Sequence, residues 1–282
     1  MVRAGVLLMQ FSKLPSTILS LLTSFQSTPE NTNLLLRVKP SFYTSMKKFF
    51  ITAISLCLAI VGFGQNPIGA WEGISTNEAG QKVRTVVIFA DGYQVATWYD
   101  ADSGKFISTN GGTWSLDGNT MSETVEFHTD NPEMVGETVS FEITMDDNKM
   151  GIVGREMVLN RIDNGTPGAL QGAWLMSGRK RDGEIQSRDT NRPRKTMKIL
   201  SGTRFQWIAY NTETKQFMGT GGGTYTTVDG KYTENIEFFS RDNTRVGASL
   251  EFNYALENGD WRHSGKSSKG SPIDEIWSLR KI

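Results

Sequence analysis

The sequence predicts an all-β protein of two tandem, small, antiparallel eight-stranded β-barrels that follow a signal peptide. Two observations carry this prediction. First, residues 108–128 (STNGGTWSLDGNTMSETVEFH) recur as residues 219–239 (GTGGGTYTTVDGKYTENIEFF), at an offset of 111 residues. Each copy contains a glycine run, an Asp-Gly turn and an alternating strand, which is the pattern of a β-hairpin. Second, short strand patterns separated by turn residues fill both halves, and no segment shows a sustained helical period.

The N-terminal 65 residues have the pattern of an export segment. The basic Met46-Lys47-Lys48 precedes an apolar run that ends at Gly62, and small residues then lead to a cut before Gln65. This order predicts a signal peptide over 46–64 and an exported chain, periplasmic or extracellular. The run is short for a membrane span, which needs about 20 apolar residues, and a buried helix is the alternative. Residues 1–45 are either a tail or the result of a start assigned too early.

The composition of the remaining chain excludes several classes of partner. Residues 1–65 hold six basic residues and one acidic residue, so the rest carries 24 basic and 29 acidic residues. This net negative charge argues against nucleic acid, because phosphate binding needs clustered Lys and Arg. The only cysteine, Cys57, lies in the predicted signal, which excludes disulfides from the mature chain. We expect no cofactor, no metal site and no transmembrane segment in the mature chain.

The first predicted barrel covers residues 66–162. It opens with Gly69-Ala70-Trp71, and a β-branched stretch then ends at the turn pair Asp91-Gly92. After the opening motif, the expected strands cover residues 83–90, 93–99, 105–116, 121–128, 135–145, 149–153 and 156–162. Many short strands at close spacing, with turn chemistry between them, are typical of a small antiparallel barrel.

The second predicted barrel, residues 172–282, follows a linker at 163–171 that is rich in Gly, Pro and Asn. Equivalent residues share the offset of 111, including Tyr99 and Tyr210, Phe106 and Phe217, Glu123 and Glu234, and Phe127 and Phe238. The first loop of the second copy is eight residues longer, because Trp71 and Trp174 are 103 residues apart. The last strands align at an offset of 119 or 120, and the sequence does not decide between these values.

The ends of each copy favour closure of the sheet into a barrel. Each copy opens with Gly-x-Trp and ends with a strand that carries a cation, so we expect Arg161 to lie over Trp71 and Arg280 or Lys281 over Trp174. Closure also removes exposed edge strands. The run Gly221–Gly223 fits a strand that bends at a barrel corner.

These motifs resemble the lipocalin or calycin superfamily, and the second copy resembles uncharacterised bacterial secreted lipocalin-like domains. The residues that carry the resemblance are 205–210 (FQWIAY), 221–225 (GGGTY), 232–234 (YTE), 259–265 (GDWRHSG) and 275–277 (EIW). The resemblance covers the second copy well and the first weakly, because residues 147–154 lack the Trp and His of 260–265. It implies a ligand-holding barrel, which is an analogy from the fold.

The candidate ligand site lies in the second copy and comprises Trp207, Tyr225, Glu234, Trp261 and His263. Aromatic rings with one titratable group suit a flat or sugar-like ligand, and a lumen carboxylate suits an amine or a hydroxylated ligand. The alternative for the aromatic residues is core packing. The alternative for Glu123 and Glu234, which share strand parity with Phe127 and Phe238, is a carboxylate paired with Arg or Tyr of a neighbouring strand.

From these observations we expect an exported protein that binds a small apolar or aromatic molecule, mainly in the second barrel. The alternative is a cell-envelope module with side-chain-filled barrels. It would contact protein or glycan through the basic segment 179–198, which holds eight cations and three acids. No catalytic residues are predicted, since no ordered triad is present. An enzyme that uses His263 and Glu234 as acid and base is a further alternative.

Overall fold

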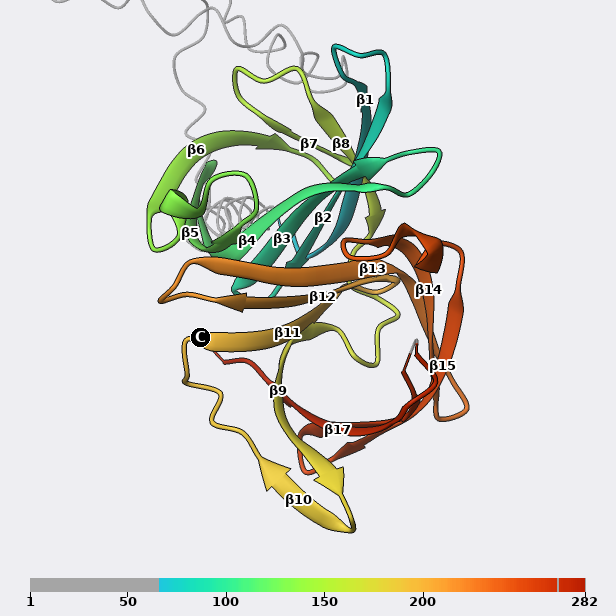
Figure 1. The fold of residues 1–282 in the computed structure, drawn as a ribbon. Coiled ribbons are helices and arrows are strands. Elements are labelled where there is room, and N and C mark those ends of the chain that lie inside the picture. Colours follow the sequence, from blue (N-terminus) through green and yellow to red (C-terminus); the bar gives the residue numbers. More distant parts are fainter. Residues whose placement is uncertain (1–65, 268, 282) are drawn as a thin grey trace, which may run out of the picture. The chain divides into compact units, whose positions relative to one another are not determined.

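The computed structural model describes residues 66–267 and 269–281, and within them the prediction of two tandem antiparallel eight-stranded barrels is confirmed (Figure 1). The predicted signal peptide at 46–64 and the segment 1–45 lie outside the described residues. No helix in the described part of the chain is long and apolar enough to cross a membrane.

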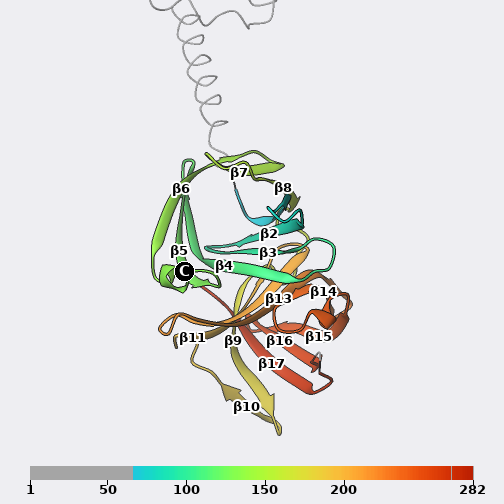
Figure 2. The ribbon, with the colours of Figure 1, turned by 45° about the horizontal axis from the view of Figure 1, so that its top comes forward.

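The first barrel is a continuous antiparallel sheet in which each strand pairs with the next along the chain (Figure 2). It closes where the first strand pairs with the last, with Trp71 opposite Arg161. Its strands are β1 (Gly69–Thr76), β2 (Lys82–Ala90), β3 (Tyr93–Asp100), β4 (Phe106–Asp117), β5 (Thr120–His128), β6 (Thr138–Met145), β7 (Lys149–Ile152) and β8 (Val158–Asp163).

The second barrel repeats this order with one added strand, β10, which pairs only with the end of β9. The longer first loop predicted for this copy therefore forms a β9–β10 hairpin that projects from the barrel (Figure 1). The strands are β9 (Gly172–Arg181), β10 (Glu184–Ser187), β11 (Arg194–Leu200), β12 (Arg204–Asn211), β13 (Gln216–Val228), β14 (Lys231–Phe239), β15 (Ser249–Glu257), β16 (Asp260–Lys266) and β17 (Pro272–Leu279). Closure is by β9 and β17.

The turns and bends follow local sequence chemistry. Asp182-Gly183, Asp229-Gly230 and Asn258-Gly259 all have positive φ at both residues, which matches the twist of tight two-residue hairpins. The bend expected in β13 occurs between Gly222 and Gly223, where the register with β14 shifts. A Cβ on Gly223 would lie 2.0 Å from the carbonyl oxygen of Asn235, so only glycine fits there.

Arg161 closes the first barrel over the indole of Trp71, as the sequence predicts. Its guanidinium carbon lies 3.9 Å from the ring centroid. The same guanidinium donates to the carbonyl oxygens of Ile68 and Asn66, each at 3.0 Å. The indole of Trp71 in turn donates to the carbonyl of Pro67 at 2.8 Å. The last strand and the segment that leads into the first strand are therefore held together around one tryptophan.

The expected equivalent in the second barrel, Arg280 over Trp174, is wrong. The strand register places Leu279 opposite Trp174, as it places Arg161 opposite Trp71. The last strands therefore align at an offset of 118, not 119 or 120, and Arg280 lies one residue beyond the position of Arg161. Because neighbouring strand residues face opposite sides of a sheet, this shift turns the arginine away from the indole.

Arg280 instead joins the two barrels. Its guanidinium lies 4.1 Å from the ring centroid of Tyr93 and forms two hydrogen bonds to the carboxylate of Glu126, at 2.6 and 2.8 Å. Both partners belong to the first barrel. The matched carboxylate, Glu237, is paired with Arg204 of its own barrel. Arg280, which was predicted to close the second barrel, therefore binds the first barrel instead.

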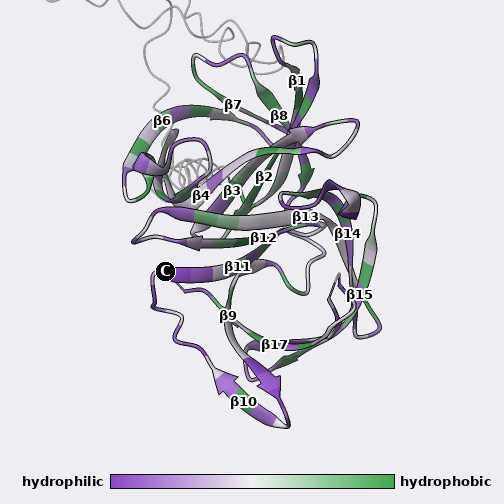
Figure 3. Cartoon of the chain, viewed as in Figure 1, coloured by the Kyte–Doolittle hydropathy of each residue, from purple (hydrophilic) through white to green (hydrophobic). Residues whose placement is uncertain are grey.

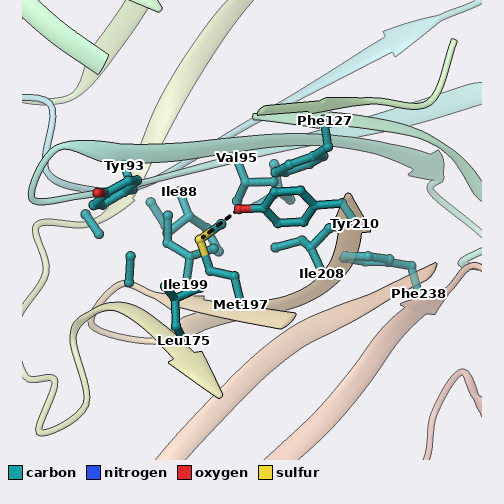
Figure 4. Close-up of a cluster of buried hydrophobic side chains, with 14 of the residues drawn as sticks. Ile88, Tyr93, Val95, Phe127, Leu175, Met197, Ile199, Ile208, Tyr210 and Phe238 are labelled. Carbon is teal, nitrogen blue, oxygen red and sulfur yellow. Dashed lines mark hydrogen bonds between the residues drawn. The ribbon is translucent and has the colours of Figure 1, made fainter. Parts of the chain in front are cut away.

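A shared apolar core lies between the outer faces of the two barrels (Figure 4). Phe127 and Phe238 belong to this core, so they do not share a face with Glu123 and Glu234 as expected. The register shifts at Gly111–Gly112 and Gly222–Gly223 reverse the strand parity between them. Phe106 and Phe217, which occupy matched positions, stack on each other with ring centroids 6.1 Å apart. The buried members of the core are Ala70, Val86, Ile88, Ala90, Tyr93, Val95, Tyr99, Phe127, Ala173, Leu175, Met197, Ile199, Ile208, Tyr210 and Phe238.

Polar contacts across this core are reciprocal. The Tyr99 hydroxyl donates to Glu237 of the second barrel at 2.7 Å, and the Tyr210 hydroxyl donates to Glu126 of the first at 2.5 Å. Burial is the main factor that raises the pKa of both tyrosines, and the adjacent carboxylates raise it further. The two copies therefore meet through equivalent surfaces, as in a two-fold symmetric dimer.

Asp163, the last residue of β8, anchors the connection between the barrels. Its carboxylate accepts hydrogen bonds from the backbone and hydroxyl of Thr203 at 3.0 and 2.6 Å, and from the hydroxyl of Ser201 at 2.8 Å. Burial alone would raise the pKa of Asp163, but these bonds together lower it. The segment that links the barrels is thereby tied to the β11–β12 turn.

We predict that Arg280→Ala lowers the free energy of unfolding by about 2–4 kcal/mol, because it leaves the Glu126 carboxylate largely buried without its cation. Urea denaturation of the full chain measures this loss. The control is Lys281→Ala, which removes an exposed cation one residue away and should change stability by less than about 0.5 kcal/mol. Equal losses in the two variants would contradict the interface role of Arg280.

Candidate functional site

The five candidate site residues of the second barrel lie in or against one packed cluster. Trp261, His263, Tyr225 and Glu234 are each at most 4 % exposed, and Trp207 packs at the edge of the cluster against Phe239. The structure brings Trp261 and His263 together, with ring centroids 5.3 Å apart. The alternative of core packing, rather than an open aromatic cup, describes these side chains.

Some polar groups of this cluster have hydrogen-bond partners, whereas Trp261 Nε1 and His263 Nε2 have none among the described residues. The Tyr225 hydroxyl donates to the carbonyl of Ser201 at 2.6 Å. His263 Nδ1 lies 3.1 Å from Glu275, so its hydrogen-bond partner is not Glu234. Burial lowers the pKa of His263, and the nearby ammonium of Lys198 lowers it further, which favours the neutral ring. The two groups considered as an acid and base pair are thus each committed to another partner.

The centre of the second lumen is a buried ion pair that sequence reasoning missed. Lys198 Nζ lies 2.6 Å from the carboxylate of Glu234, and both side chains are 6 % exposed. The ammonium is 4.9 Å from the ring centroid of Tyr232, 5.0 Å from that of Trp261 and 5.3 Å from that of Trp277. The carboxylate is therefore neutralised by a cation that reaches across the lumen from β11, not by Arg or Tyr of a neighbouring strand.

Lys198, the last cation of the basic segment 179–198, is buried and therefore cannot make the contact with protein or glycan expected of that segment. Its position in β11, between Met197 and Ile199, places it on the lumen face, opposite Trp174 and Trp207. The signal available in the sequence was its equivalence, at the offset of 111, to Val87 on an apolar strand. Most of the remaining basic segment is exposed, and Figure 3 shows hydrophilic residues along the β9–β10 hairpin.

Five side chains that fill the lumen of the second barrel are replaced in the first barrel by smaller or unbranched ones. By strand register, Val87 replaces Lys198, Ala96 replaces Trp207, Met121 replaces Tyr232, Met150 replaces Trp261 and Leu159 replaces Trp277. Val87, Ala96, Met121, Met150 and Leu159 all line one cavity of about 330 Å³. The loss of four aromatic rings and a lysine therefore coincides with open space in the lumen.

This cavity is mainly apolar. Its remaining lining residues are Thr85, Phe89, Gln94, Trp98, Asn110, Glu123, Phe141, Ile143, Gly151, Ile152, Arg155 and Met157. A second hollow of about 370 Å³, lined in part by Ile107 and His128, shares Trp98 and Asn110 with the first. The cavity lies in the first barrel, whereas the expected ligand site lies in the second.

Glu123 faces the cavity without a hydrogen bond or ion pair to any residue that the structure describes. Burial raises the pKa of the Glu123 carboxyl to about 7. Arg155, the other charged residue of the lining, is exposed. Glu123 matches Glu234, whose carboxylate is paired with the ammonium of Lys198. Both copies therefore keep the glutamate, but only the second copy has the lysine that neutralises it.

Residues 66–267 and 269–281 contain no group of three or more His, Cys, Asp or Glu side chains placed to hold a metal ion. Apart from Arg155, the polar side chains that line the first cavity are a carboxylate, two amides and a hydroxyl, from Glu123, Gln94, Asn110 and Thr85. This set suits hydrogen bonding to an organic ligand.

We predict that Lys198→Met lowers the free energy of unfolding by about 3–5 kcal/mol, because it leaves the Glu234 carboxylate buried and unpaired. Urea denaturation measures the change. The same substitution at the exposed Lys180 is the control and should cost less than about 0.5 kcal/mol. The double variant Lys198→Met with Glu234→Leu should recover part of the loss, and a further decrease would contradict the pairing.

We predict that Glu123→Gln stabilises the protein at high pH. A carboxyl with a raised pKa in the folded state binds its proton more tightly there, so stability falls as pH rises from about 4.5 to about 7. Glutamine has no charge to bury, so the variant should gain roughly 2–3 kcal/mol at pH 8 and almost nothing at pH 4. Denaturation curves at both pH values test this, and a difference independent of pH would refute it.

Comparison with known proteins covers the second barrel only. Residues 169–280, which include β9 to β17, match a family model described as Domain of unknown function (DUF4488). No curated protein matches the chain. The match shows that the second barrel is similar to a recognised domain, and the description of that domain names no activity. Function therefore has to be argued from the geometry of the site.

Proposed function

We propose that this protein binds a small, mainly apolar molecule inside its first barrel, and that its role is binding rather than catalysis. The observation that carries this proposal is the cavity of about 330 Å³ in the lumen of the first barrel. In the second barrel, aromatic side chains fill the corresponding space. Pockets for small molecules are apolar, concave and about 300–1,000 Å³ in volume, with a few polar groups that orient the ligand. The signal peptide predicted at 46–64 supports a site of action outside the cytoplasm.

The difference between the two lumens supports this assignment. Trp174, Tyr232, Trp261 and Trp277 pack edge-on or tilted around Lys198 in the second barrel, so that lumen stabilises the fold. The first barrel retains the acid but lacks these rings. Its cavity is lined by Met121, Met150 and Met157, by aliphatic residues and by the rings of Phe89, Trp98 and Phe141. Methionine adapts to irregular ligands because its side chain is unbranched and polarisable.

The alternative function uses the outside of the second barrel. The β9–β10 hairpin projects into solvent with Arg179, Lys180 and Arg181 exposed, and Ile185 is 54 % exposed. Such a surface suits an anionic protein or glycan of the cell envelope. This role does not need the cavity, so the experiment on the cavity separates the two proposals.

We predict that the full-length protein binds N-phenyl-1-naphthylamine, a neutral dye whose emission rises in apolar surroundings. Ala96→Trp, which copies Trp207 of the second barrel, should weaken dye binding at least tenfold because it fills the cavity. Met150→Trp, which copies Trp261, should act in the same way. Ala79→Trp, in an exposed turn, is the matched control and should leave dye affinity unchanged. Absence of dye binding would remove the first lumen as the site and leave the hairpin as the candidate.

A further inference from the structure

Two glutamates at matched positions have opposite surroundings. Glu234 in β14 has an ammonium group 2.6 Å from its carboxylate, supplied by Lys198. Glu123 in β5 has no partner among the residues that the structure describes, and the position of Lys198 is held by Val87. Glu123 is half-buried, and burial of a carboxylate without a partner is costly because it removes hydration that nothing replaces. The first barrel therefore lacks one cation relative to the second.

The missing cation corresponds to open space. In the second barrel the ammonium lies about 5 Å from the rings of Tyr232 and Trp261. The residues at those two positions in the first barrel, Met121 and Met150, line the cavity together with Val87 and Glu123. The place that Lys198 occupies in the second barrel therefore corresponds, in the first barrel, to an open cavity with apolar walls beside the carboxylate of Glu123.

We propose that the ligand of the first barrel carries a protonated amine that pairs with Glu123, while its apolar body occupies the cavity in the place of the Lys198 stem. This inference rests on the proposed function and names the class of ligand. The ligand's ammonium would give Glu123 the positively charged partner that Lys198 gives Glu234 in the second barrel. Charge-assisted hydrogen bonds of this kind are about twice as strong as neutral ones.

The other groups of the lining are consistent with an amine. Thr85, Gln94 and Asn110 are uncharged and can accept further hydrogen bonds from an ammonium. Arg155 is the remaining charged group of the lining; it is exposed and forms no ion pair with Glu123 among the described residues. A carboxylate ligand held by Arg155 is the opposite arrangement. It would place two negative charges in one apolar lumen, which is unfavourable.

The test compares three probes of equal length, octylamine, octanol and octanoate, by displacement of the bound dye from the full-length protein at pH 8. Octylamine should bind at least tenfold more tightly than octanol. Glu123→Gln should abolish this preference and leave octanol affinity within about threefold, which keeps the test independent of the apolar contacts. Val87→Lys, which copies Lys198, should also abolish the preference because it supplies an internal ammonium.

A pH series gives a second readout. Octylamine remains protonated between pH 5 and 8, so any change of its affinity reports the titration of the protein. Since burial raises the pKa of Glu123 to about 7, octylamine affinity should fall about tenfold for each pH unit below that value, whereas octanol affinity stays constant. Arg155, the other charged residue of the lining, is exposed.

The outcomes separate this inference from the proposed function. Equal affinities for octylamine and octanol would overturn the amine inference and leave a binding protein for apolar molecules. Tighter binding of octanoate would overturn it in favour of an anionic ligand at Arg155. Failure of all three probes and of the dye to bind would overturn both proposals. A preference for octylamine that survives Glu123→Gln would show that another group recognises the amine.

Discussion

The contact between the two barrels is the constraint on which the rest of the structure depends. Each barrel has an outer face of β-branched and aromatic side chains that would be unfavourable in water, and each covers the face of the other. The reciprocal Tyr99–Glu237 and Tyr210–Glu126 bonds set the relative position of the two faces. Because equivalent surfaces meet, the tandem copies behave as the two subunits of a covalently linked dimer.

This arrangement allows the two lumens to differ. The shared core and the second lumen, with Lys198, Glu234 and their aromatic neighbours, contribute stability that does not depend on the first lumen. The first barrel can then hold smaller side chains, an open cavity and an uncompensated carboxylate, each of which costs stability. The two copies thus divide into a filled barrel, which supports the fold, and a barrel with an open cavity, in which we propose that a ligand binds.

The fold was predictable because its signals are local or repeated. Strand alternation, Asp-Gly turns and the offset of 111 are visible without coordinates, and they predict two antiparallel barrels. The contact between Arg161 and Trp71 followed from the same reasoning, since a closed barrel makes its first and last strands neighbours. Arg280 was misassigned because the offset of the last strand is 118, and an error of one residue reverses the face of a strand residue.

The sequence by itself determined the number of barrels, their strand order and the retention of an acid in both, because these depend on patterns within a strand or between copies. Only the tertiary structure decided which lumen is filled, since lumen volume depends on side chains from many strands at once. It also decided that Lys198 is buried against Glu234, although the two residues are 36 positions apart and lie on non-adjacent strands. Contacts across a lumen have no sequence period, so the cavity beside Glu123 became visible only in three dimensions.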